Sequence, residues 1–414
     1  MLEFIKIVDV KSIKSYFSSL PFFLLCLYIL FMYIAQETLL PTIIHSVVMF
    51  CMIGVVIFCM FLKWSRNIQK IITRFTIWYS IFFIFCYLSA FLSKQSDPSI
   101  LYPIVVSLVI PFCFIQTIDT TVKLEACLNV YIISALIMAF LLWQTGQLDY
   151  LHIAAHSEAR LGTDVTGNAN IFTALIMYAE VFAAWFMIYK KKKVSRLIYF
   201  LAFILLLFIM VVSGGRKTII AVIGALSVFL ILKDNNRKVI RNIITVILFI
   251  TAIFIAILKI PLLYELIGER FEGLFAFFSG KESSVSSDST RGQIFLLALK
   301  GWSEHPLFGH GIDSFKFLNR STTGHFYYAH NNFAELLYDV GIIGFAIFYY
   351  MFFYIYRNLR KVEAHNHKYK VLGLGLLVEL LLFDIGGVSY YLVGNIIILS
   401  IAYMCIMFQK VDDI

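Results

Sequence analysis

The chain has 414 residues, of which 61% are hydrophobic and 14% are charged, and its mean hydropathy is +0.86. A soluble domain is nearer half apolar and a quarter charged, so this composition excludes an ordinary soluble protein and predicts a polytopic membrane protein. The net charge of +9 does not indicate nucleic-acid binding, because the basic residues cluster between apolar runs. The seven cysteines lie in or beside apolar runs, so neither a disulfide framework nor a zinc site is indicated. We also expect no metal and no cofactor.

Twelve long, continuously apolar runs follow in chain order, and they predict membrane-spanning helices rather than barrel strands. The first run lacks a cleavable signal pattern and is interpreted as a true span. The eighth run is shorter than the ~17 residues that a span needs. The predicted spans are Phe17–Ala35, Ile43–Leu62, Phe75–Leu92, Leu101–Ile118, Leu124–Trp143, Ile171–Tyr189, Val194–Val212, Thr218–Leu232, Val239–Leu258, Phe333–Tyr356, Tyr369–Val388 and Leu392–Phe408.

Loop charge predicts how these spans are oriented. If the N-terminus is cytoplasmic, the cytoplasmic segments hold 23 of the 34 Lys and Arg residues, although the outer segments contain far more loop sequence. Both termini are therefore expected in the cytoplasm. The predicted fold is an all-α polytopic membrane protein with about 12 transmembrane helices in one domain, residues 1–414. Residues 259–332, between helices 9 and 10, form a large extracytoplasmic loop.

This outer loop contains two predicted amphipathic helices, Leu262–Phe278 and Arg291–Ser303, which we expect to lie along the membrane face. A Ser-rich stretch, Ser279–Thr290, separates them and is expected to be mobile. The turn Pro306–Gly311 and an aromatic cluster, Phe326–Tyr328, follow. The loop therefore brings aromatic side chains close in sequence to the next span.

That span has a polar head, His330-Asn331-Asn332. If the helix begins near Asn331, His330 shares one face with Gly341 and Gly344, and these glycines permit close packing of another helix. A histidine can take up a proton near neutral pH, so His330 is a candidate base at the mouth of the helix. The alternative interpretation is that it only caps the helix.

A tight turn, Ser213–Lys217, places Arg216 and Lys217 on the outer side, where the positive-inside rule does not expect basic residues. Basic side chains beside glycines at a helix N-terminus suit an anion such as pyrophosphate. The alternative is a hairpin turn with snorkelling side chains.

Two more outer arginines are candidates. Arg291 begins the second amphipathic helix, and Arg160 precedes Gly167–Asn170. The alternative interpretation of Gly167–Asn170 is a helix cap. Acids inside membrane spans are functional candidates by default. Here they are Glu180, Glu335, Asp339, Glu379 and Asp384.

These motifs resemble those of the bacterial O-antigen ligase and O-antigen or capsule polymerase family. The resemblance covers roughly residues 167–344. One departure is Gly215, where members often have Ser. The pieces that carry the resemblance are the Pro306–Gly311 turn with Phe315, the pattern His-Asn, nine residues, Gly, two residues, Gly at His330–Gly344, the Ser213–Arg216 turn and Gly167–Asn170.

The resemblance implies an all-helical bundle that transfers glycans from a polyprenyl-diphosphate carrier, such as undecaprenyl diphosphate. His330 matches the essential histidine of the family, and Arg216 and Arg291 match its essential arginines. These positive charges are expected to hold the diphosphate without a metal. The expected substrate-binding residues are Lys217, Arg160, Asn331, Asn332, Tyr327, Tyr328 and Trp302.

We expect a glycan polymerase that joins lipid-linked repeat units on the outer face of the bacterial plasma membrane. The alternatives are an O-antigen ligase that moves the finished glycan onto lipid A core or a protein, and a transporter or flippase that couples through Glu180, Glu379 or Asp384. Expected partners are the lipid-linked glycans, membrane lipid, a flippase and a chain-length regulator, but no nucleic acid. Sugar, linkage, species and oligomeric state are not visible in the sequence.

Overall fold

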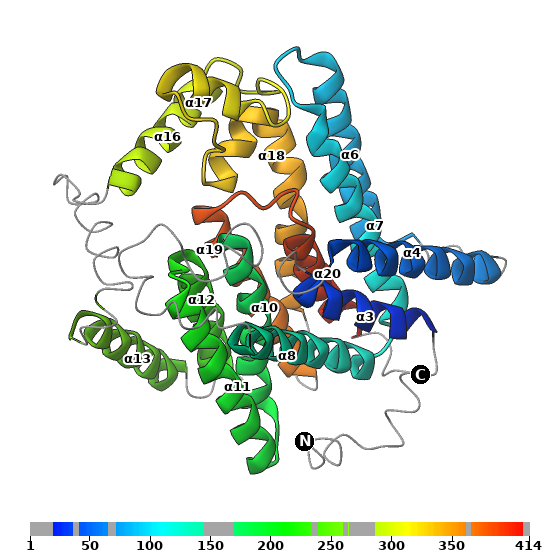
Figure 1. Ribbon diagram of the computed structural model, residues 1–414, viewed down its shortest axis with the longest axis vertical. Coiled ribbons are helices and arrows are strands. Elements are labelled where there is room, and N and C mark those ends of the chain that lie inside the picture. Colours follow the sequence, from blue (N-terminus) through cyan, green and yellow to red (C-terminus); the bar gives the residue numbers. More distant parts are fainter. Residues whose placement is uncertain are drawn as a thin grey trace.

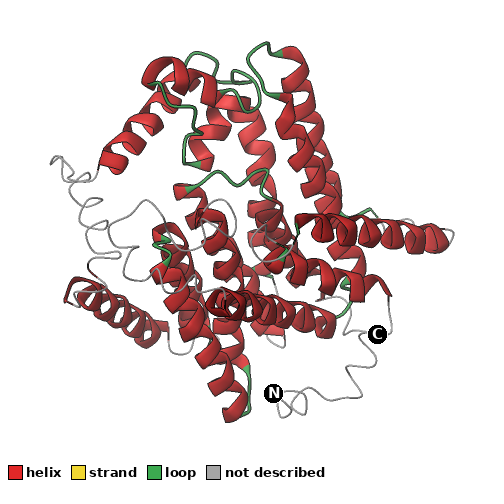
Figure 2. Ribbon diagram, viewed as in Figure 1, coloured by secondary structure: helices red, strands yellow, loops and turns green. Residues whose placement is uncertain are grey.

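The structure is a computed structural model. It describes residues 20–35, 41–64, 72–144, 169–233, 239–259, 264, 286–361 and 366–408. Helices account for nearly all of this described part, which contains no strand (Figure 2). The helices are α3 (Leu20–Ile34), α4 (Thr42–Trp64), α6 (Arg74–Leu92), η1 (Pro98–Ile100), α7 (Leu101–Thr117), α8 (Thr121–Gln144), α10 (Ala169–Tyr189), α11 (Lys193–Val212), α12 (Arg216–Leu232), α13 (Val239–Lys259), α16 (Ser286–Trp302), α17 (Phe315–Thr323), α18 (Asn332–Leu359), α19 (His367–Gly386) and α20 (Val393–Met407).

Each of the twelve predicted spans coincides with a helix of the described chain. Among the described residues, seven stretches, from 42–60 to 332–359, are long and apolar enough to cross a membrane, and α3 and α20 are shorter apolar helices. Helical segments satisfy their own backbone hydrogen bonds, which a membrane requires. The predicted all-α polytopic membrane fold is therefore confirmed.

Ion pairs join connecting segments that the predicted topology places on the same side of the membrane. Glu125, at the start of α8, bonds to Lys190 after α10 (3.0 Å) and to Lys368 at the start of α19 (2.7 Å). These are three segments predicted on the cytoplasmic side. Lys316 in the outer loop instead reaches Asp97, between α6 and α7, at 2.7 Å. The two groups of loops are thus each held together by charge.

Helix α10 forms the centre of one half of the bundle, because its side chains are buried along almost its whole length. It packs against α8, α11 and α12, and α12 in turn packs against α19 (Figure 1). The outer-loop helices α16 and α17 lie beside the start of α18, at the top of the view. The start of α18 therefore lies between this outer-loop unit and the bundle.

Helix α18 is broken at Gly341, whose φ of 65° and ψ of −172° are not helical. The turn Pro306–Gly311 docks into the break. Its carbonyls accept hydrogen bonds from Ile342 (2.9 Å) and Ile343 (3.2 Å), and its amides donate to carbonyls on the preceding side of the break. The expectation of one continuous helical face from His330 to Gly344 is therefore wrong beyond Gly341.

Substituting Gly341 with alanine should destabilise the fold strongly. An alanine Cβ would lie 2.3 Å from the carbonyl oxygen of Leu307, in a left-handed conformation that side chains disfavour. We expect Gly341→Ala to lower the free energy of unfolding by at least 1–3 kcal/mol, roughly the energy of one strained backbone position. The measurement is thermal unfolding of the purified protein in detergent.

The matched control is Gly54→Ala in α4, where an added Cβ meets nothing within 4 Å. That change should be neutral or stabilising by about 0.4–1 kcal/mol, because alanine restricts the unfolded chain. Equal effects of the two substitutions would contradict the docked turn.

Candidate active site

His330 lies immediately before α18 in a left-handed conformation, with φ of 55°. Such a conformation is uncommon for a side-chain-bearing residue and persists only where its surroundings fix it. The residues on both sides are fixed here. The amide of Ala329 donates to the Glu335 carboxylate, and Asn331 caps the helix by accepting from the amide of Ala334 at 3.0 Å. The backbone of His330 is thus held from both directions.

The imidazole of His330 lies beside aromatic rings and interacts electrostatically with two positive charges. Its ring centroid is 4.4 Å from that of Tyr328 and 6.3 Å from that of Tyr327. Burial, together with the positive charges of Arg291 and Lys217, lowers the pKa of His330 to about 4. Arg291 is on α16 and Lys217 is on α12, so three separate elements bring these groups together. His330 is therefore neutral at pH 7 and able to accept a proton.

This pKa is open to direct measurement. In the wild-type protein the His330 resonance should titrate near pH 4, well below the ~6.5 of an unperturbed histidine. Arg291→Ala should raise the pKa of His330, because removing a neighbouring positive charge favours the protonated imidazole. The measurement is a histidine NMR titration, with His330→Gln assigning the resonance. A pKa near 6.5 in the wild type, unmoved by Arg291→Ala, would contradict the arrangement.

Arg216 and Lys217 begin α12 after a compact turn. Gly214 in this turn has φ of 66°. A Cβ on Gly215 would lie 2.5 Å from the Thr218 hydroxyl and 2.8 Å from the Thr173 methyl group. Glycine is therefore the residue that fits at 215, which explains the departure from serine noted in the sequence.

Lys217 lies between α12 and the end of α19. Its ammonium nitrogen is 4.1 Å from the centre of the Phe383 ring, a cation–π contact. A Cβ on Gly387 would lie 2.5 Å from that nitrogen, so the missing side chain leaves it room. Lys217 also interacts electrostatically with Arg291 and Asp384. Arg216 is half-buried at the first position of the same helix.

A buried polar network joins the start of α18 to the end of α19. Asp384 accepts hydrogen bonds from the Ser389 hydroxyl, from the Tyr349 hydroxyl at 2.8 Å and from the Asn332 amide at 3.4 Å. The Asn332 side-chain oxygen accepts from the amides of Ser389 (2.8 Å) and Tyr390 (3.1 Å). Satisfied networks of this kind rigidify the parts that they join. The mouth of α18 is therefore fixed relative to the segment beside Lys217.

Asn331 and Asn332, expected to bind substrate, both serve this connection. Asn332 is fully buried, and Asn331 donates to the carbonyl of Ile385 at 3.0 Å. Their contact with substrate stays a prediction. The structure adds a positioning role, because the two amides hold the residue after His330 against α19.

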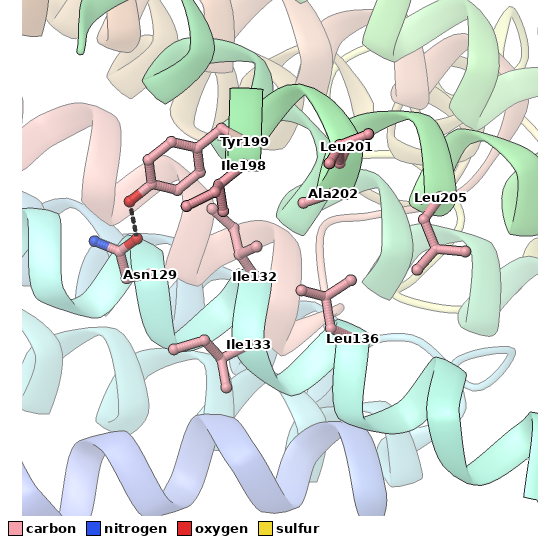
Figure 3. Close-up of a pocket in the computed structure, with 9 residues that line it drawn as sticks. All are labelled: Asn129, Ile132, Ile133, Leu136, Ile198, Tyr199, Leu201, Ala202 and Leu205. Carbon is pink, nitrogen blue, oxygen red and sulfur yellow. Dashed lines mark hydrogen bonds between the residues drawn. The ribbon is translucent and has the colours of Figure 1, made fainter. Parts of the chain in front are cut away.

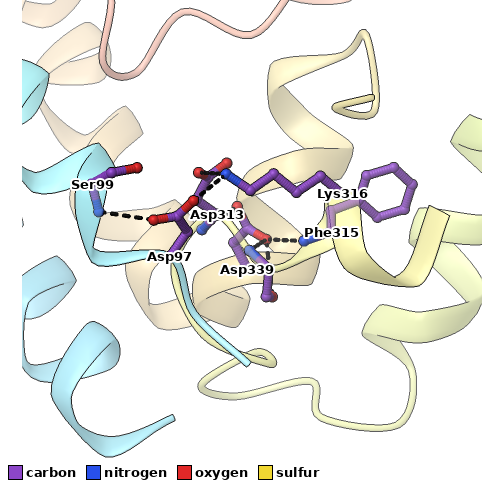
Figure 4. Close-up of polar contacts among 7 residues, drawn as sticks. Asp97, Ser99, Asp313, Phe315, Lys316 and Asp339 are labelled. Carbon is purple, nitrogen blue, oxygen red and sulfur yellow. Dashed lines mark hydrogen bonds and ion pairs between the residues drawn. The ribbon is translucent and has the colours of Figure 1, made fainter. Parts of the chain in front are cut away.

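Asp339 holds part of the outer loop in place through hydrogen bonds to its backbone (Figure 4). Its carboxylate accepts from the backbone amides of Asp313 (2.9 Å), Ser314 (3.0 Å) and Phe315 (3.0 Å), where α17 begins. A carboxylate is favoured at such a helix N-terminus. Lys316 next to it bonds to both Asp313 and Asp97, and its hydrogen bond lowers the pKa of Asp97 to about 2.

The same part of the chain matches a known protein family. Residues 201–349 match the family model described as O-antigen ligase. The chain thus contains a domain that matches the O-antigen ligase model. This domain contains Arg216, Arg291 and His330, and it confirms the family resemblance of the sequence. No curated protein matches the chain significantly. The match supports glycan transfer of the O-antigen ligase or polymerase type.

Within the O-antigen ligase domain, Arg291 is exposed on α16, which packs against α18 through Ile294 and Ala298. This helix begins at Ser286, so residues 286–290 of the Ser-rich stretch are helical, and the mobility of the stretch stays a prediction. Serine and aspartate are favoured at helix starts, which is why that polar run begins a helix. Trp302 donates to the carbonyl of Pro306 at 3.0 Å and so supports the docked turn.

Several expectations fall outside the described residues. Arg160 and all of the predicted helix Leu262–Phe278 except Tyr264 are among them. Conversely, the network partners Tyr349 and Ser389 were not singled out in the sequence, because a tyrosine or serine in an apolar run carries no signal of its own. Their acidic partner Asp384 does carry a signal, since an ionisable residue at membrane depth needs a partner.

Proposed function

We propose that this protein transfers glycan from a polyprenyl-diphosphate donor to a sugar hydroxyl on the outer face of the bacterial plasma membrane. The observation that carries the proposal is the convergence of His330 with Arg291 and Lys217 inside an O-antigen ligase domain. A proton acceptor beside fixed positive charge suits the attack of a hydroxyl on a sugar diphosphate. Both termini are proposed to be cytoplasmic.

In the proposed reaction, the acceptor hydroxyl oxygen forms a bond to the anomeric carbon of the donor sugar. The bond between that carbon and the diphosphate oxygen breaks, and its electron pair leaves with the diphosphate. The hydroxyl proton passes to the neutral imidazole of His330. Arg216, Arg291 and Lys217 stabilise the leaving diphosphate, a role that fixed cations fulfil without a metal.

The donor itself is proposed to prepare the base. Burial, together with the positive charges of Arg291 and Lys217, keeps the pKa of His330 low in the unliganded protein. A bound diphosphate brings negative charge that offsets these cations, so the pKa of His330 rises when the donor arrives. His330 then accepts a proton more readily in the complex than in the free protein.

Tyr327 and Tyr328 are proposed to stack on acceptor sugars. Tyr328 is half-buried beside His330, whereas Tyr327 is 54% exposed and extends the aromatic surface outward. Burial raises the pKa of Tyr328, so its hydroxyl stays protonated and can donate a hydrogen bond to a sugar. Such an amphipathic ring surface suits sugar faces.

We favour polymerisation of lipid-linked repeat units, and the second candidate is the ligation that the family description names. Cells that lack the protein separate the two functions. Loss of a polymerase leaves single repeat units on the carrier lipid, whereas loss of a ligase leaves long chains there. A flippase and a chain-length regulator are the partners proposed for the polymerase.

A transporter is the alternative class of protein. Glu180 and Glu379 are fully buried at the interior of the bundle, and their carboxyl oxygens have no hydrogen-bond partner in the described chain. Their interaction with each other is electrostatic. The cations and aromatic rings around His330 favour glycan transfer instead, because a transporter places its binding residues near the membrane midplane.

A further inference from the structure

An apolar groove lies between α8 and α11 (Figure 3). None of the residues that line it belongs to the site around His330. Its volume is about 270 Å³. The two helices both pack against α10 and only lightly against each other, which leaves the groove between them. Its walls include Ile132, Ile133 and Leu136 from α8 and Ile198, Ala202 and Leu205 from α11.

One end of the groove is closed by a polar contact. The hydroxyl of Tyr199 donates to the side-chain oxygen of Asn129 at 2.7 Å (Figure 3). In the predicted topology this end faces the cytoplasm. Above it the wall is aliphatic, and Leu205 is 46% exposed. The groove therefore suits a hydrocarbon chain that enters from the outer side.

Helix α11, which forms one wall of the groove, leads to the proposed diphosphate site. α11 ends at Val212, and the turn that follows carries Arg216. Gly215 of this turn lies against Thr173 near the start of α10. A headgroup held at Arg216 would thus leave its tail at the outer end of α11, above the groove.

Depth along α11 indicates which tail fits. At ~1.5 Å of rise per residue, Leu205 lies about 10 Å and Ile198 about 21 Å along the helix from Val212. The hydrocarbon core is about 30 Å thick, so its centre is about 15 Å from either edge. With Val212 at the outer edge and α11 along the membrane normal, as the predicted topology places them, the groove crosses the bilayer centre. A tail that hangs from the outer face must be longer than one leaflet to fill it.

We propose that this groove binds the distal part of the donor's polyprenyl tail, an inference that rests on the proposed function. The tail passes from the diphosphate at Arg216 along α11 and reaches the floor at Tyr199. Tail length then becomes a determinant of donor affinity, separate from the diphosphate contacts.

The first test compares donors that carry the same glycan on an undecaprenyl or a farnesyl tail. Leu205→Trp should obstruct the groove and raise the ratio of the undecaprenyl KM to the farnesyl KM about tenfold, the effect of losing roughly two buried CH₂ groups. Ile204→Trp is the control, because Ile204 is 45% exposed but does not line the groove. It should leave the ratio unchanged. A ratio unmoved by Leu205→Trp, or moved equally by Ile204→Trp, would overturn the proposal.

The second test needs no turnover. Undecaprenyl diphosphate with a photoreactive group at the distal end of its tail should crosslink to peptides containing residues 129–136 or 198–205 of the wild-type protein. Crosslinks only elsewhere would refute the groove. So would a photoreactive phospholipid that labels these peptides and is not displaced by undecaprenyl diphosphate, because the occupant would then be ordinary membrane lipid. Absence of glycan transfer from both donors would instead refute the proposed function, whatever the crosslinks show.

Discussion

Replacing His330 by glutamine should lower the rate of glycan transfer by on the order of 10²–10⁴, the usual contribution of a general base. Glutamine keeps hydrogen bonding and a similar size but cannot take the proton of the acceptor hydroxyl. The backbone of His330 is held through Ala329 and Asn331, so the variant should fold and bind lipid-linked donor normally. The measurements are single-turnover rates and donor affinity in the same membrane preparation.

The matched control is His325→Gln. His325 is exposed on the same segment and stacks on Tyr327 at 5.7 Å, but it is not among the charged groups around His330. Its substitution should leave transfer within a few-fold of wild type. Near-normal turnover of His330→Gln, or loss of donor binding in step with activity, would remove the assignment of the base and leave His330 a binding or structural role.

Substituting Arg291 with alanine should lower kcat/KM by about 10²–10³, as removal of one fixed charge-stabilising group does in other enzymes. The leaving diphosphate loses one of its three proposed cations. The same change should raise the pKa of His330, so the acid limb of the kcat/KM profile moves to higher pH. Loss of rate together with this upward shift would identify Arg291 as a member of the site.

Two further variants sharpen this test. Arg291→Lys retains the positive charge but not the planar guanidinium with its several donors. It should therefore restore the low pKa of His330 more fully than the rate of glycan transfer. Arg320→Ala is the control, because Arg320 is an exposed arginine of the same outer loop whose guanidinium lies 5.7 Å from the Phe326 ring. A loss of rate for Arg320→Ala equal to that for Arg291→Ala would point to a general effect of outer-loop charge.

The helices were predictable because continuous apolar runs of membrane length have few other stable structures. The break at Gly341 was not, since glycine is ordinary in membrane helices and its left-handed conformation depends on the turn Pro306–Gly311 docking from elsewhere. The roles of Asp339 and Asp384 were signalled only as buried acids. Their partners come from other elements that spacing along the sequence does not reveal.

The candidate site was also predictable from the sequence only in part. The position of His330 at the mouth of α18 followed from the polar head that precedes an apolar run, and the structure adds that Asn331 caps the helix. Its lowered pKa did not, because it arises from burial and from Arg291 and Lys217, which belong to helices distant in sequence. Gly215 was visible only as a departure from the family pattern, and its physical reason required the positions of Thr173 and Thr218.

Glycan transfer from a polyprenyl-diphosphate donor without a metal can be tested directly. Purified protein in lipid nanodiscs is supplied with a synthetic polyprenyl-diphosphate repeat unit, in the presence of a chelator. We predict one polyprenyl diphosphate released for each glycosidic bond formed, and longer glycans on the carrier lipid. An intact donor after incubation with folded protein, or transfer that strictly requires added Mg²⁺, would contradict the account.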